Sequence, residues 1–314
     1  MNSSVAKSIA GTHNKPELGQ SDASSWTKNR HRTDKMMRWL FVGSTVLVSC
    51  IIFSIILFVG FQGIQTFKDV NPFTFFFSME WVPANNQFGT FSFLFSTLAL
   101  TGLSILMVVP LAVSAAIFMA KIAPKWMREI LRPAAELFVG IPSVVYGLIG
   151  LTVIVPWLAN ISGTAGYGIL PAAIVLAVMI LPTILSVSED ALRALSPGLQ
   201  EASLALGATR WQTIWRVLLP AARPGIITGI ILGIGRALGE TMAVFMVIGN
   251  SPLLPKSWLE STTVLTTAIV KDMGNTHHGT AWNNALYMMA FVLLVISLIL
   301  ILAIRIIAKR SEVK

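Results

Sequence analysis

Two charged side chains lie in the middle of an apolar stretch of the sequence. Arg236 and Glu240 fall within residues 225–249, where most other side chains are apolar or small. A charge inside a membrane is costly unless it is paired or hydrated, so such a residue is a candidate for function. Their spacing of four residues places both on one face of a helix, together with the small residues of this stretch.

This pair supports two interpretations. In the first, Arg236 and Glu240 neutralise each other, or pair with a partner subunit, and fasten a helix bundle. In the second, the Arg236 guanidinium attracts an anion to a pathway, with Glu240 holding the arginine or accepting a hydrogen bond from a protonated oxyanion. Because a carboxylate repels a fully ionised anion, the pair suits an anion that carries hydrogen.

A second polar group lies in another apolar stretch, at Gly140-Ile141-Pro142-Ser143-Val144-Val145-Tyr146-Gly147. Pro142 lacks a backbone donor and disturbs a helix, and Ser143 and Tyr146 offer hydroxyls three residues apart. These two hydroxyls could line a pathway, or they could satisfy the groups that the broken turn leaves free.

The segment from Ser188 to Arg223 contains a third candidate feature. Ser196-Pro197-Gly198 should break a helix, and a short helix with small residues should follow around Glu201-Ala202-Ser203. Gly207 can then supply a sharp turn or a close backbone approach. Such a helix could dock in a groove of another protein, or it could lie along the membrane surface.

The elements that position these residues are predicted from composition. The chain has 314 residues, of which 54% are hydrophobic and 12% charged, and its mean hydropathy is +0.74. A soluble domain has about 25% charged residues, so we expect an all-α integral membrane protein. Six stretches reach the roughly 20 apolar residues that a span needs. They are residues 39–61, 91–120, 134–158, 168–187, 225–249 and 284–307.

The basic residues predict the orientation of these spans. Lys and Arg number 19 in residues 1–38, in the loops before the third and fifth spans and in the C-terminal segment, against three in the alternate loops. Cytoplasmic segments are enriched in Lys and Arg, so both termini should be cytoplasmic. Residues 1–38 are expected to form a disordered basic tail, and residues 308–314 a C-terminal tail. The net charge of +9 is then explained by the orientation of the chain in the lipid bilayer, and no nucleic-acid partner is expected.

The sequence lacks the motifs of several classes of enzyme and nucleotide-binding protein. No G-x-x-x-x-G-K-[ST] loop occurs, and the glycines of residues 233–239 have the wrong spacing for a dinucleotide fingerprint. H-E-x-x-H and G-x-S-x-G are also missing, and Cys50, the single cysteine, excludes an internal disulfide. His277-His278 has no third ligand. We therefore predict no catalytic residue, metal or cofactor.

The loop before the fifth span resembles the EAA loop of ABC-importer permeases. Glu201-Ala202-Ser203 is followed after three residues by Gly207, and Val217-Leu218-Leu219-Pro220 comes nine residues later. Ser203 stands for the second alanine of the family pattern. The resemblance implies the type I ABC-importer permease fold and a coupling loop at residues 188–223. It also implies that Glu201, Ala202, Ser203 and Gly207 dock on an ATPase subunit.

Two further segments are similar to the permeases of phosphate importers. These are Gly235-Arg236-Ala237-Leu238-Gly239-Glu240-Thr241 and the Ile141–Gly147 segment, and Met179-Ile180-Leu181-Pro182-Thr183 also matches. Trp81-Val82-Pro83 and Phe88-Gly89 resemble the PstC type rather than its sibling. The resemblance covers residues 80–307.

This resemblance implies a set of partners in the bacterial inner membrane. They are a sibling permease of PstA type, ATPase subunits of PstB type and an extracytoplasmic phosphate-binding protein of PstS type. The chain would then be a transporter subunit rather than an enzyme, with Arg236, Glu240, Ser143 and Tyr146 along the substrate pathway. A permease for sulfate, molybdate or another oxyanion, and a proton-coupled carrier, are the alternatives.

Overall fold

The computed structural model describes residues 20–312, with side chains for residues 34–306. The first 19 residues of the expected N-terminal tail, and residues 313–314, lie outside the described part. The chain divides into two units, residues 1–57 and residues 58–314. Most of the first helix belongs to the first unit, and every other element belongs to the second.

The structure is almost entirely helical. Its first half contains α1 (Gln20–Ile64), η1 (Gln65–Lys68), α2 (Pro72–Phe77), β1 (Trp81–Val82), η2 (Pro83–Asn85), β2 (Gln87–Phe88), α3 (Phe91–Ile117), η3 (Phe118–Ile122), α4 (Lys125–Gly140), α5 (Ser143–Ile149), η4 (Gly150–Ile154) and α6 (Val155–Ser162). Its second half contains α7 (Ile169–Arg193), α8 (Pro197–Ala205), α9 (Arg210–Thr213), η5 (Ile214–Leu218), α10 (Leu219–Gly239), α11 (Met242–Val247), α12 (Leu265–Met273) and α13 (Ala281–Glu312).

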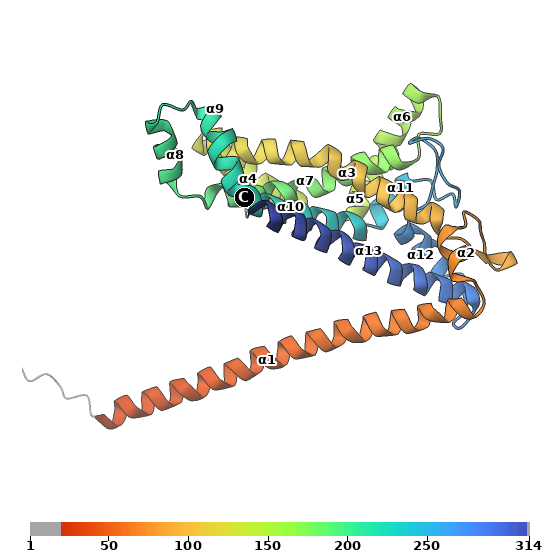
Figure 1. The fold of residues 1–314 in the computed structure, drawn as a ribbon, viewed down its shortest axis with the longest axis horizontal. Coiled ribbons are helices and arrows are strands. Elements are labelled where there is room, and N and C mark those ends of the chain that lie inside the picture. The colour runs from red at the N-terminus through yellow and green to blue at the C-terminus, as the bar shows by residue number, and fades with distance from the viewer. Residues whose placement is uncertain (1–19, 313–314) are drawn as a thin grey trace, which may run out of the picture. The chain divides into compact units, whose positions relative to one another are not determined.

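Six helical segments are long and apolar enough to cross a membrane within the described residues, as the sequence predicts. They are Asp34–Lys68, Phe91–Ile122, Ser143–Ser162, Ile169–Arg193, Arg210–Gly239 and Ala281–Ile306. In the second unit, α8 and α9 lie at one end of the bundle, and α2, α6 and α12 lie toward the other (Figure 1). The loops between spans therefore collect at opposite ends, as a multi-pass bundle requires.

The third span begins later than residue 134, the start expected from the apolar run. Helix α4 ends at Gly140, and Ile141 and Pro142 adopt extended backbone with ψ of 130° and 137° before α5 begins. Proline disfavours helical backbone in the residue before it and cannot donate to the preceding turn. Residues 134–140 therefore belong to α4, a separate amphipathic helix, and only residues 143–162 form the span.

The fifth span also differs from the expected continuous helix over residues 225–249. Helix α10 ends at Gly239, Glu240 is extended with φ −70° and ψ 132°, and α11 starts at Met242. Glycine weakens a helix at this point, and the polar residues after it can cap a new one. The expectation that Arg236 and Glu240 share one helix face is therefore wrong.

The two expected tails are also shorter than the sequence suggests. Helix α1 already begins at Gln20, and α13 continues through Glu312. Residues 20–38 contain neither proline nor glycine. The helix of the first span can therefore begin before residue 39 without interruption. The described parts of both segments are helical extensions of the first and last spans.

Helix α7 forms the centre of the second unit. It packs against α3, α10, α4 and α11, and Leu176, Ile180 and Ile184 on it are fully buried. A row of glycines on α10 faces it. A Cβ on Gly229 would lie 3.2 Å from the Val187 Cβ, and one on Gly233 would lie 2.7 Å from the Ile184 Cδ1. These glycines let the two backbones approach closely, as small residues do between membrane helices.

A separate cluster of buried side chains holds the hairpin of β1 and β2. The strands pair antiparallel, with Trp81 opposite Phe88. The Trp81 ring packs edge-on against Phe88 and Phe93, with centroids 5.4 and 5.3 Å apart. Leu265 of α12 and Leu286 of α13 belong to the same cluster. The hairpin is thereby attached to the ends of three helices.

We predict that Gly229→Leu lowers the free energy of unfolding by about 1–3 kcal/mol, because the added side chain must enter the packed seam between α10 and α7. Unfolding of the purified chain in detergent micelles measures this. Gly235→Leu on the same helix is the matched control, since a Cβ there meets nothing within 4 Å. Equal destabilisation by both variants would contradict close packing at Gly229.

Candidate functional site

Arg236 is fixed by a hydroxyl from the neighbouring helix. Its Nη1 donates a hydrogen bond of 2.9 Å to the Oγ1 of Thr183 on α7. Arg236 is half-buried. The contact brings together two segments that lie far apart in the sequence, Gly235–Thr241 and Met179–Thr183. Thr183 was not predicted as a site residue, although Pro182-Thr183 interrupts an otherwise apolar run in its helix.

The glycine row of α10 sets the register of this contact. Gly225 packs on Ala191, Gly229 on Val187 and Gly233 on Ile184, so successive turns of α10 meet successively earlier turns of α7. Arg236 lies one turn after the last of these glycines, and its side chain, which points back toward the N-terminus of α10, reaches Thr183 beside Ile184. The close approach of the helices is what lets a long side chain reach a short one across the seam.

Most of the hydrogen-bonding capacity of Arg236 is unused by the protein. A guanidinium has five N–H donors, and the bond to Thr183 is the single side-chain hydrogen bond of Arg236 within residues 34–306. The remaining donors are free for water or for an anion. A group of this kind can bind an oxyanion bidentately.

Glu240 has a structural task at the helix break. Its Oε1 accepts a hydrogen bond of 3.1 Å from the backbone N–H of Ala243, in the first turn of α11. The Thr266 hydroxyl of α12 donates to the Glu240 carbonyl at 3.1 Å. Both contacts satisfy backbone groups that the break leaves without helical partners, which is the condition for irregular backbone at membrane depth.

Within residues 34–306, Arg236 and Glu240 do not form the ion pair that the first of the two interpretations allowed. The ion pairs within residues 34–306 join Arg132 to Glu136 and Asp190, and Arg193 to Glu189. The break after Gly239 places Glu240 outside α10, and its carboxylate accepts from the first turn of α11 instead. A glycine followed by Glu-Thr is a signal for helix end and restart, and it could have predicted this arrangement.

Tyr146 and Ser143 lie at the other helix break. The Tyr146 hydroxyl donates a hydrogen bond of 2.8 Å to the carbonyl of Phe138, in the last turn of α4. Of the two interpretations for this hydroxyl, the structure favours the one in which it satisfies the broken turn. Ser143 is half-buried, and its hydroxyl has no hydrogen-bond partner among the side chains that the structure describes.

Helix α5 places this break beside the other one. A Cβ on Gly147 would lie 2.9 Å from the Ala243 Cα, so α5 and α11 are in backbone contact. The α5 and α11 helices that follow the two breaks therefore pack against each other. The breaks after Gly140 and Gly239 thus lie in one region of the bundle.

The expected short helix of the coupling loop is α8. Glu201 and Ala202 are exposed on it, and Leu206 beyond it is 89% exposed. Gly207 has φ +84°, and a Cβ there would meet nothing within 4 Å. The turn that glycine was expected to supply is confirmed, and the surface around it is open.

Ser203 differs from the other residues of this motif. It is buried, and its Oγ shares a hydrogen bond of 2.9 Å with the Thr213 Oγ1 of α9. Thr213 also donates to the Thr209 carbonyl at 3.1 Å. Ser203 therefore joins α8 to α9 inside the loop instead of facing outward, so the docking role expected for it does not fit its position.

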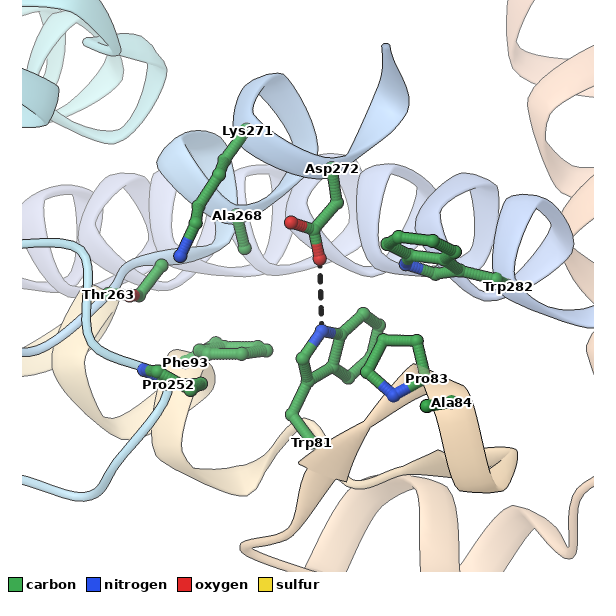
Figure 2. A pocket seen from close by; sticks show the side chains of 10 residues that line it. All are labelled: Trp81, Pro83, Ala84, Phe93, Pro252, Thr263, Ala268, Lys271, Asp272 and Trp282. Carbon is green, nitrogen blue, oxygen red and sulfur yellow. Dashed lines mark hydrogen bonds between the residues drawn. The ribbon is translucent and has the colours of Figure 1, made fainter. Parts of the chain in front are cut away.

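A cavity of about 460 Å³ lies between the hairpin and α12, at the end of the unit opposite α8. Figure 2 shows Trp81 beneath it, with its indole N–H donating to the Asp272 Oδ2 at 3.0 Å. Lys271 extends beside Asp272 and donates to the Asn250 carbonyl at 2.9 Å. Trp81 belongs to a motif of the sequence, whereas no local pattern identifies Lys271 or Asp272, because their contacts join residues far apart in the chain.

Comparisons with known proteins agree with this architecture. Residues 112–313 match the family described as binding-protein-dependent transport system inner membrane component. The probable ABC transporter permease protein YqgH of Bacillus subtilis (strain 168) is 46% identical over 292 residues, covering 91% of this chain and 94% of that protein. The phosphate transport system permease protein PstC of Xylella fastidiosa (strain 9a5c) is 32% identical over 303 residues, covering 90% and 93%.

A solved structure supports the fold. A chain of a bacterial ABC transporter involved in the import of the acidic polysaccharide alginate superposes with a TM-score of 0.60 at 20% identity, covering 89% of this chain and 99% of that one. The chain therefore belongs to the family of inner membrane components of binding-protein-dependent transport systems, and it has the type I ABC-importer permease fold.

Proposed function

We propose that this chain is the PstC-type permease subunit of an ATP-driven importer of inorganic phosphate. The Arg236–Thr183 contact is the observation that carries this proposal. It holds a cation at the seam of two membrane helices and leaves most guanidinium donors free for an oxyanion. The matching segments of phosphate-importer permeases and the PstC relative named above support the choice of anion.

Glu240 favours phosphate over sulfate in this proposal. Its Oε1 accepts from the Ala243 N–H, which leaves the second carboxylate oxygen for another donor. Phosphate at neutral pH carries a proton and can donate to that oxygen, while sulfate cannot. We place Ser143 beside the same route, and we assign Tyr146 the task of holding the α4–α5 break that borders it.

The proposed orientation has both termini in the cytoplasm, because basic residues concentrate in the terminal segments and in the loops that contain α4 and α8. Residues 39–307 then form the permease domain, with the loop of residues 188–223 facing the cytoplasm. The hairpin and α12 face the opposite side, where a binding protein delivers substrate.

The energy for transport is proposed to come from partner subunits. The chain lacks a P-loop motif, and α8 presents Glu201, Ala202 and the open turn at Gly207 to an ATPase subunit of PstB type. Ser203 acts from inside the loop by joining α8 to α9. A sibling permease of PstA type and a phosphate-binding protein of PstS type complete the complex.

The proposed substrate is tested by reconstituting the complex in liposomes and measuring ATP hydrolysis. We expect stimulation by the phosphate-loaded binding protein and none by the same protein without ligand. Stimulation by a sulfate-loaded binding protein, with none by the phosphate-loaded one, would assign the permease to another oxyanion. Uptake driven by a proton gradient without ATPase subunits would indicate a secondary carrier.

We predict that Arg236→Gln lowers the initial rate of phosphate uptake about tenfold or more, because a charge-assisted contact to the anion is lost. Thr183→Val should cause a smaller loss, since Arg236 keeps its charge and loses its fixed orientation, and Thr183→Ser should be close to the native chain. Thr228→Val is the control, because that hydroxyl bonds to a carbonyl of its own helix. If Arg236→Gln instead disassembles the complex, Arg236 has a structural role.

We predict that Gly207→Leu leaves membrane insertion intact and abolishes association with the ATPase subunits, as measured by co-purification. Gly163→Leu is a matched control, because Gly163 also has a positive φ, +69°, and open space around it. Gly207→Asn tests backbone strain, since asparagine tolerates positive φ; it should also weaken association. Normal association of Gly207→Leu would contradict docking at this turn.

A further inference from the structure

A second cavity, of about 520 Å³, lies beside the coupling loop. Its walls come from η3 at the end of α3, from α8, and from the helical run of α9 and η5. Lys121 contributes from η3, Gln200 from α8, and Arg210 and Trp211 from α9. The cavity therefore lies where the end of a membrane span meets the loop that contains α8.

The charge in this cavity is uncompensated. Lys121 and Arg210 both line it, and none of its lining residues is acidic. Within residues 34–306, the ion pairs and side-chain hydrogen bonds include neither Lys121 nor Arg210. Arg128 lies near enough to Lys121 to add to the positive potential. Among the described residues, Arg132 pairs with Glu136 and Asp190, and Arg193 pairs with Glu189.

Lys121 is half-buried and Arg210 is exposed, and both line this cavity, so an anion bound in it would be attracted by two cations. A phosphate group fits the rest of the lining. Its oxygens accept hydrogen bonds, and the lining offers the Lys121 ammonium, the Arg210 guanidinium and the Gln200 amide as donors. Basic residues next to a membrane span attract anionic headgroups, with about 1 kcal/mol per Lys or Arg.

We propose that this cavity binds a phosphate group, either the headgroup of an anionic phospholipid or free inorganic phosphate. The proposal rests on the lining of the cavity and not on the anion that the chain transports. A bound phosphate would join η3 to α8 and α9, next to the Ser203–Thr213 hydrogen bond. Occupancy would thereby restrain the position of α8, the helix that we assign to ATPase docking.

The experiment compares the full-length native chain with the double variant Lys121→Gln/Arg210→Gln. Lys125→Gln/Arg216→Gln is the control, because it removes the same charge from two exposed residues that do not line the cavity. Native mass spectrometry measures retention of phosphatidylglycerol against phosphatidylcholine, and equilibrium dialysis measures binding of inorganic phosphate. The unfolding midpoint of each variant verifies folding, and Lys121→Arg/Arg210→Lys preserves the charge if the Gln variant fails to fold.

We expect at least one of the two probes to bind about tenfold more weakly to the double variant than to the control. Loss of phosphatidylglycerol alone identifies a lipid headgroup as the ligand, and loss of inorganic phosphate alone identifies the free anion. The effect should persist in an Arg236→Gln background, which separates this cavity from the proposed pathway. Equal binding of both probes by the double variant and its control would overturn the proposal.

Discussion

Irregular backbone and charge inside a membrane both require partners supplied by the protein, and this requirement governs the second unit of the chain. The break after Gly239 leaves backbone groups without helical partners. The Glu240 carboxylate accepts from one N–H of α11, and the Thr266 hydroxyl donates to the Glu240 carbonyl. The break after Gly140 is closed in the same manner by the Tyr146 hydroxyl. The third span thus begins, and the α10 span ends, at a break where nearby side chains hydrogen-bond to backbone groups.

The glycine row of α10 positions this helix against α7. It brings α10 against α7 and sets the register in which Arg236 reaches Thr183. The cation is thereby oriented through one hydrogen bond and keeps its remaining donors. An ion pair between Arg236 and Glu240 would have taken up donors of the guanidinium and neutralised its charge. In the observed arrangement, the carboxylate caps a helix, and the guanidinium bonds to Thr183 and keeps its other donors for the anion passage that we propose.

Much of this fold could be predicted from sequence, because apolar runs of sufficient length identify membrane spans whatever their tertiary contacts. The short helix α8 and the turn at Gly207 were also predictable, since Ser-Pro-Gly and an isolated glycine are strong local signals. The disturbance at Pro142 was predicted, but the apolar run on both sides placed the start of the span before it. The break at Glu240 was missed because apolar residues flank it and hydropathy does not register a change of backbone direction. Thr183 and Asp272 were missed because their contacts join residues 53 and 191 positions apart. The inward orientation of Ser203 likewise depends on Thr213.

The central claim is that the break at Gly239 borders a watery route through the assembled complex. Gly239 is exposed, and a Cβ there meets nothing within 4 Å; it also lies one turn from Arg236 on the same face of α10. Gly239→Cys in a Cys50→Ser background would place the single thiol of the chain at this point. We predict that a charged, membrane-impermeant thiol reagent modifies this cysteine, and that the rate of modification changes when the ATPase subunits bind nucleotide. Modification by lipid-soluble reagents alone would place this face against lipid and contradict the account.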